Sequence, residues 1–81
     1  MAKSASVVAE DIRDLMNTNH KNVVTFQWGQ MYRVADRERW KESFQIQLTE
    51  ELRKLSLLSM FGNTVVVIAK DYNFEPLENF K

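Results

Sequence analysis

The chain has no cysteine, one histidine, one proline and two glycines among its 81 residues. Without cysteine there can be no disulfide and no thiolate ligand, which excludes a disulfide-stapled scaffold and a cysteine-based zinc site. One histidine alone cannot supply the remaining ligands of a metal site. We therefore expect no metal, no cofactor and a reducing, cytoplasmic setting.

Long apolar runs and an excess of one charge are also missing. The longest purely apolar run is Val65–Ala69, far below the roughly 20 residues that span a bilayer. Eleven basic residues balance eleven acidic ones, whereas nucleic-acid-binding domains are commonly basic. The sequence predicts no membrane partner, and it makes a nucleic-acid partner a secondary expectation.

The apolar fraction is high by contrast, at 44%, and it includes five Phe, two Trp and two Tyr. This content is enough for a packed core and argues against disorder. A chain of this length corresponds to one domain. We expect a single α+β domain over residues 1–81, in which residues 71–81 form a C-terminal extension that packs on the core or on a partner.

Three segments have clear local patterns. Residues 5–17 carry apolar side chains at helical spacing, which predicts a first helix. Residues 22–28 are β-branched and aromatic and end at Gly29, which predicts a strand followed by a turn. Residues 64–70 are apolar at consecutive positions, which predicts a central strand covered on both faces. The helical positions of the first segment are Val8, Ile12, Leu15 and Met16.

The longest predicted element is an amphipathic helix over residues 35–61, ended by Gly62. At about 3.6 residues per turn, six large apolar side chains share an arc of roughly 120°. An α-β-α-β order follows, with the long helix packed on a small sheet. The six side chains are Trp40, Phe44, Leu48, Leu52, Leu55 and Leu58.

An alternative interpretation divides this long helix. Ser43–Thr49 alternates polar and apolar residues as a half-buried strand does. Thr49 could then cap a shorter helix after it. Under this interpretation the segment becomes a turn, a strand and a helix, and the sheet gains a third strand.

Two features of the predicted fold indicate a homodimer. Two strands make a poor sheet, and a helix of about 27 residues would be about 40 Å long, against a domain diameter of about 30 Å. Further apolar residues lie off the main arc or in the C-terminal extension, where a second chain could cover them. The candidate self-association residues are Ile46, Leu57, Phe61, Phe74, Leu77 and Phe80.

One segment has a local excess of positive charge. Residues 33–41 hold four cations against two carboxylates, a net charge of plus two, with Tyr32 and Trp40 beside them. Such a patch could bind phosphates, although an ordinary solvated helix face with i,i+3 ion pairs is the favoured interpretation. The candidate nucleic-acid-binding residues are Arg33, Arg37, Arg39, Lys41, Arg53 and Lys54.

No catalytic constellation is visible. Neither glycine belongs to a phosphate-binding loop, and Ile68-Ala69-Lys70 lacks the carboxylate that a metal-dependent nuclease would place there. The chain is expected to be a non-enzymatic regulatory or accessory protein that acts through protein–protein binding as a homo-oligomer, with an unknown protein partner. A nucleic-acid-binding regulator is the alternative, and a small metal-dependent enzyme is the least favoured.

Overall fold

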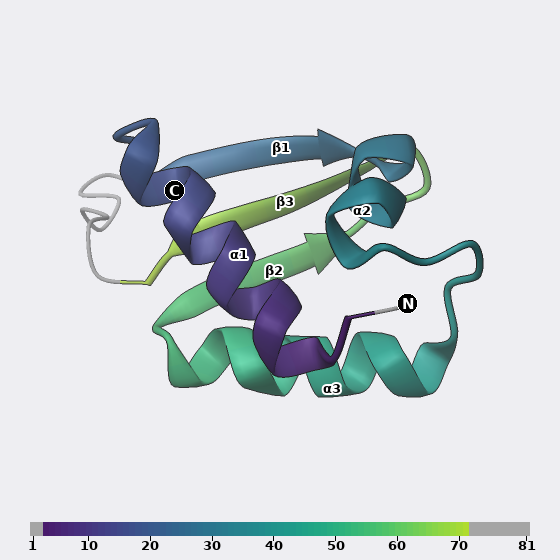
Figure 1. The fold of residues 1–81 in the computed structure, drawn as a ribbon. Coiled ribbons are helices and arrows are strands. Elements are labelled where there is room, and N and C mark those ends of the chain that lie inside the picture. The colour runs from purple at the N-terminus through teal and green to yellow at the C-terminus, as the bar shows by residue number, and fades with distance from the viewer. Residues whose placement is uncertain (1–2, 72–81) are drawn as a thin grey trace, which may run out of the picture.

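The computed structural model describes residues 3–71, which form three helices and a three-stranded antiparallel sheet (Figure 1). The strand order is β1-β3-β2, so the strand that comes last in sequence is the central one. The predicted α+β class is confirmed. The elements are α1 (Ala5–Thr18), β1 (Val23–Gln27), α2 (Trp28–Ala35), α3 (Glu42–Lys54), β2 (Leu57–Phe61) and β3 (Val65–Lys70).

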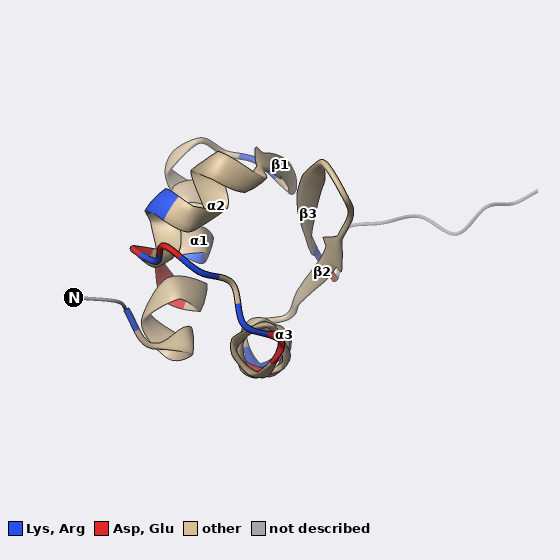
Figure 2. Ribbon diagram, turned by 90° about the vertical axis from the view of Figure 1, so that its right-hand side faces the viewer, with Lys and Arg blue, Asp and Glu red and all other residues tan. Residues whose placement is uncertain are grey.

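The helices form one layer and the sheet forms the other, as Figure 2 shows. α1 packs against α3, α2 packs against α1 and β1, and α3 also contacts β2. The core lies between the two layers, where apolar side chains from all six elements except β1 are fully or almost fully buried. Its largest members are Ile12, Met16, Met31, Leu48, Leu52, Leu57, Ile68, Val8 and Val66.

The first helix agrees with the prediction to within one residue. Ser4 caps it, because its Oγ accepts a hydrogen bond from the amide of Val7 at 3.4 Å. Val8, Ile12 and Met16 form the buried stripe, while Leu15 at its margin is 41% exposed. The apolar stripe therefore places α1 against the rest of the core.

The predicted long helix over 35–61 is wrong. α2 ends at Asp36, whose backbone is left-handed with φ 53°. The amides of Asp36 and Arg37 donate to the carbonyls of Arg33 and Tyr32, which closes the helix end. An irregular connection over 36–41 then leads into α3. This local capping interrupts a helix that side-chain periodicity alone would continue.

The C-terminal part of the predicted helix is a strand. α3 is capped by Leu55, and Ser56 is left-handed with φ 61°. The next residues form β2, in which Leu58 is 44% exposed although its spacing from Trp40 suits a helix. Leu58, which lies on the outward face of this strand, thus extended the helical pattern of α3 by coincidence. The element order is α-β-α-α-β-β.

The alternative interpretation of Ser43–Thr49 as a strand is also wrong, because the segment lies within α3. Phe44 and Leu48 are buried at i,i+4 spacing, but Ile46 between them is 56% exposed. The Thr49 hydroxyl donates to the carbonyl of Gln45 at 2.9 Å, one helical turn back, and caps nothing.

The third strand comes from this chain and completes the sheet. β3 pairs on one side with β1, where Thr25 lies opposite Val67, and on the other with β2, where Met60 lies opposite Val67. β3 is central as predicted, but the helices cover only one of its faces. The incomplete sheet and the overhanging helix, which were the two arguments for a homodimer, therefore no longer apply.

The two glycines play different parts from those predicted. Gly29 lies in the first turn of α2, because β1 passes directly into that helix at Gln27. Gly62 lies in the β2–β3 turn, where its amide donates to the carbonyl of Val65 at 2.9 Å. A Cβ at Gly62 would lie 3.0 Å from the same oxygen, so close approach favours glycine there.

All three helices instead end at left-handed residues that carry side chains. These residues are His20 after α1, Asp36 after α2 and Ser56 after α3, with φ 54°, 53° and 61°. Glycine adopts this conformation without steric cost, whereas other residues pay about 1–2 kcal/mol. The chain therefore ends its helices without using either glycine.

Candidate binding surfaces

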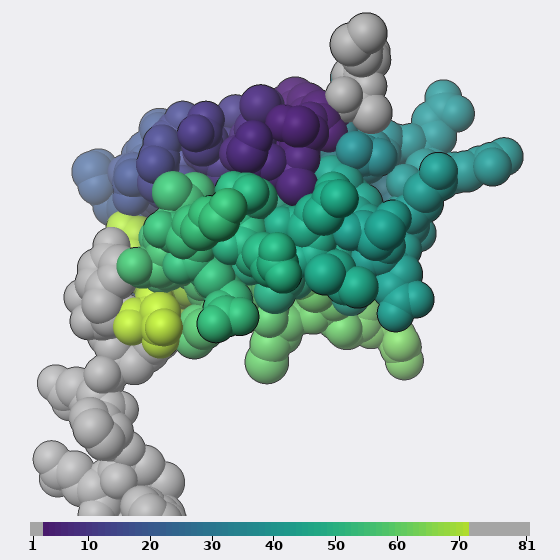
Figure 3. All heavy atoms as spheres, turned by 90° about the horizontal axis from the view of Figure 1, so that it is seen from below, coloured from purple at the N-terminus to yellow at the C-terminus, as the bar shows by residue number. Residues whose placement is uncertain are grey.

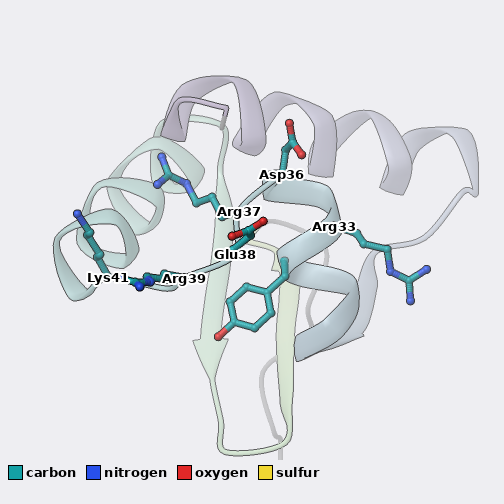
Figure 4. A pocket seen from close by; sticks show the side chains of 7 residues that line it. Arg33, Asp36, Arg37, Glu38, Arg39 and Lys41 are labelled. Atoms are coloured by element: carbon teal, nitrogen blue, oxygen red, sulfur yellow. The ribbon is translucent and has the colours of Figure 1, made fainter. Parts of the chain in front are cut away.

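The connection between α2 and α3 lines an open hollow of about 600 Å³, which we call the basic hollow (Figure 4). Four of the six predicted phosphate-binding residues line it. Arg53 and Lys54 do not, since they lie about 18 Å further along α3. Figure 3 shows side chains of this connection projecting from one end of the molecule. The lining residues are Tyr32, Arg33, Asp36, Arg37, Glu38, Arg39 and Lys41.

Arg37 is held by the protein itself. Its Nη2 donates to the carbonyl of Lys3 at 3.0 Å, and its Cζ lies 3.7 Å from the centre of the Phe44 ring. Its Nε is buried without a hydrogen-bond partner. These contacts join the residues before α1 to the start of α3, so Arg37 supports the fold and is poorly placed to bind a phosphate.

The other charges of the basic hollow do not converge. In Figure 4 the Arg33 guanidinium points away from Arg39 and Lys41, and two carboxylates, those of Asp36 and Glu38, line the same hollow. The net charge of the lining is plus two, from four cations and two anions. The basic hollow thus offers Arg39 and Lys41 as exposed cations beside Tyr32, and its described lining residues do not form a convergent phosphate site.

The second pair of predicted cations lies at the end of α3. Arg53 and Lys54 occupy its last turn, where cations interact favourably with the helix dipole. Lys54 also pairs with Glu51 at 3.1 Å. Arg53 and Lys54 thus lie on a solvated helix face. The sequence favoured such a face for residues 33–41 instead, which is wrong for most of that segment, because α2 ends at Ala35 and residues 36–41 are not helical.

Five aromatic rings gather between α2, α3 and the β2–β3 turn. The Trp28 and Trp40 ring centres are 5.3 Å apart, and Trp40 meets Phe44 edge-on at 5.1 Å. The Trp28 indole donates to the carbonyl of Gly62, and the Trp40 indole donates to Oε1 of Gln45, both at 2.8 Å. The five residues, here called the aromatic cluster, are Trp28, Tyr32, Trp40, Phe44 and Phe61.

Part of this cluster lines a second surface hollow, of about 500 Å³, which we call the aromatic hollow. It holds no charged side chain, and it adjoins the basic hollow because Tyr32 lines both. Sequence reasoning missed it, since its residues come from three separate segments. The i,i+4 pair Trp28 and Tyr32 was the one local signal. The lining residues are Trp28, Tyr32, Trp40, Gln45, Gly62 and Asn63.

The sheet presents a third surface on the side away from the helices, and it carries no charged side chain. Val23, Leu58 and Met60 on this surface are 43%, 44% and 66% exposed. Strand alternation and the pairing register place its residues on one face. This open sheet face consists of Val23, Thr25, Gln27, Leu58, Met60, Val65, Val67 and Ala69.

Within the described residues, the predicted self-association residues do not form one surface. Ile46 is exposed on α3, whereas Leu57 is 2% exposed and belongs to the core. Phe61 packs half-buried in the aromatic cluster. The other three, Phe74, Leu77 and Phe80, lie outside the described residues. Two of the three described candidates, Leu57 and Phe61, thus pack inside the molecule, because both point inward from β2.

Residues 3–71 contain no group of three or more His, Asp or Glu side chains placed to hold a metal ion. His20 is exposed after the end of α1. Within the same residues, none of the helices has both the length and the apolar character required to cross a membrane.

Comparison with protein-family models, with curated proteins and with solved structures finds no match for this chain. Three surfaces described above are therefore the candidate binding sites of this protein. They are the basic hollow, the aromatic hollow and the open sheet face.

Proposed function

We propose that this protein is a non-enzymatic accessory protein that acts by binding other protein chains through the open sheet face. The observation that supports this proposal is the exposure of Val23, Leu58 and Met60 on a face without charged side chains. Contiguous apolar surface of this kind commonly marks a binding site, because leaving it in water costs about 25 cal/mol per Å².

The dimensions of the face suggest which chains it binds. Three strands at about 4.8 Å spacing and five residues at about 3.4 Å give a face of roughly 14 by 17 Å. A second copy of the chain fits, since two identical apolar sheet faces can pack about 10 Å apart around a two-fold axis. The zero net charge offers little repulsion between copies.

The same dimensions imply a weak homodimer. The face is well below the roughly 800 Å² per partner of a standard stable interface. A homodimer held by this face alone would dissociate readily and leave the face free for a different protein. We propose this exchange between self-association and a host partner as the basis of the accessory role.

Sedimentation equilibrium from about 10 μM to about 1 mM protein tests the self-association. We expect the mean mass to rise above 9.6 kDa with concentration. A double variant, Leu58→Lys and Met60→Lys, should stay monomeric because it would bury four charges across the two-fold axis. The matched control, Ile46→Lys on exposed α3, should associate like the original chain.

A mass of 9.6 kDa at every concentration would exclude the homodimer. Partner binding is then tested separately by affinity capture, comparing the original chain with the double lysine variant. Proteins that both forms retain equally would show that the open sheet face is not the binding surface.

A nucleic-acid-binding regulator is the second candidate, and the exposed cations Arg39 and Lys41 beside Tyr32 are the observation that favours it. Two phosphate contacts predict about tenfold weaker binding to mixed DNA and RNA between 50 and 200 mM salt. Substituting Arg39→Ala and Lys41→Ala together should abolish the binding. An absence of binding at 50 mM salt rules this candidate out.

A further inference from the structure

We infer that the aromatic hollow is a second binding surface, and that it takes a proline-rich peptide with an acidic residue beside the prolines. The inference does not depend on the open sheet face, because the two surfaces share no residue. Either proposal can therefore fail while the other stands.

The lining of the aromatic hollow has the chemistry that recognises proline. It consists of three aromatic rings, two side-chain amides and a glycine, without a charged group. A proline-rich segment forms an extended helix that has no internal hydrogen bonds, so its carbonyls stay free and its rings project outward. Aromatic-lined grooves bind such segments because little conformational entropy is lost.

The side-chain amides of Gln45 and Asn63 are placed to donate hydrogen bonds to the carbonyls of a bound peptide. Oε1 of Gln45 accepts the indole hydrogen bond of Trp40 at 2.8 Å, which fixes the amide orientation. The NH₂ group of Gln45 is then the end that can donate to a ligand. Asn63 offers a second amide from the exposed β2–β3 turn.

The distances between the ring centres are too short for an aromatic cage that would bind a cationic ligand. The centres of Trp28, Tyr32 and Trp40 are 5.3, 6.0 and 6.2 Å apart, which is contact distance for aromatic rings. A methylated ammonium group needs space among several ring faces, and these rings leave none between them. A ligand must lie on the rings, as a proline ring does.

The neighbouring basic hollow supplies the preference for an acidic residue. Tyr32 lines both hollows, so a peptide that passes it meets a surface with a net charge of plus two. Arg39 is exposed there and can pair with a carboxylate of the peptide. A nucleic-acid strand is less well matched, since the aromatic hollow itself has no cation for its phosphates.

Tryptophan fluorescence can test the inference, because both tryptophans of the chain line the aromatic hollow. The probe is a synthetic hexaproline peptide with a glutamate at each end, titrated into the full chain up to about 1 mM. We expect a saturable change in emission, confirmed by calorimetry. The same peptide with alanines in place of prolines should give no change.

Two variants locate the bound peptide. Tyr32→Ala should weaken binding about tenfold, whereas Tyr32→Phe, which keeps the ring, should bind like the original chain. Arg39→Glu changes only an exposed charge and should reverse the preference, so that lysine-flanked hexaproline binds better than the glutamate-flanked peptide. Val7→Ala on α1, which is 42% exposed and belongs to neither hollow nor to the open sheet face, is the matched control and should leave peptide binding unchanged.

The inference is overturned if the proline and alanine peptides behave alike, or if Arg39→Glu leaves the order of the flanking charges unchanged. It is also overturned if single-stranded oligonucleotide changes the tryptophan emission and the proline peptide does not, which would assign the aromatic hollow to nucleobases. Unfolding in urea, measured for every variant, distinguishes a lost site from a lost fold.

Discussion

The Cζ of Arg37 lies over the Phe44 ring, 3.7 Å from its centre, while the Nη2 of the same side chain donates to the carbonyl of Lys3. One side chain thereby links the residues before α1, the α2–α3 connection and α3. Arg37, the half-buried cation of the predicted phosphate-binding segment, thus stabilises the fold.

Replacement of Arg37 should destabilise the fold. Arg37→Ala removes a cation–π contact and a charged hydrogen bond, so we expect the free energy of unfolding to fall by about 1–3 kcal/mol. Arg39→Ala, two residues away and exposed, should change it by less than about 0.5 kcal/mol. Urea unfolding followed by circular dichroism measures both. Equal effects would show that the contacts of Arg37 contribute nothing.

Alanine substitutions at two apolar residues of α3 should differ sharply in how far they lower the free energy of unfolding. Leu48 is fully buried, whereas Ile46 is 56% exposed. Leu48→Ala should cost about 2–5 kcal/mol through the cavity that it leaves, and Ile46→Ala should cost less than about 0.5 kcal/mol. Thermal and urea unfolding of the pair report this difference. A large loss for Ile46→Ala at high protein concentration only would instead indicate that a partner chain covers it.

Removal of the Ser59 hydroxyl should stabilise the protein. Ser59 faces inward from β2, and its Oγ is buried without a hydrogen-bond partner. Such a group costs about 1–3 kcal/mol, so we expect Ser59→Ala to raise the free energy of unfolding by about 1 kcal/mol. Ser59→Thr keeps the hydroxyl and should give no gain. A loss of stability in Ser59→Ala would mean that the hydroxyl is satisfied in solution.

Glycine at the end of α3 should also stabilise the fold. Ser56 is exposed and left-handed, with φ 61°. Ser56→Gly removes a strain of about 1–2 kcal/mol, partly offset by the greater freedom of glycine in the unfolded chain. We expect a net gain of about 0.5–1 kcal/mol in urea unfolding. Ser56→Ala, which keeps a Cβ, is the control and should not stabilise the protein.

Elements with one dominant local signal were predictable from the sequence. α1 has a serine cap and a regular apolar stripe, and β3 has consecutive β-branched residues, so local pattern and tertiary packing agree in both. The helix breaks at Asp36 and Ser56 were not predictable in the same way. Neither residue is a glycine or proline, and a left-handed backbone at another residue type has no strong sequence signal.

The surfaces were less predictable than the elements. The basic segment was recognised, but the role of Arg37 depends on Phe44 and Lys3, which lie on other parts of the chain. The aromatic hollow joins Trp28 to Gly62 across 34 positions of sequence. The open sheet face could be identified only once Leu57–Phe61 was known to be a strand, because helical spacing had assigned those residues to a different face.

The central position of β3 has a consequence for biosynthesis. β1 and β2 do not pair with each other, and each finds its partner strand only in β3, the last described element to leave the ribosome. The helices can form early because their backbone hydrogen bonds are local, whereas pairing of β1 with β3 must close a loop of about 40 residues. Until β3 has been added to the chain, the inward residues of β1 and β2 lack their partner strand, so we expect cooperative folding only after Lys70 has emerged.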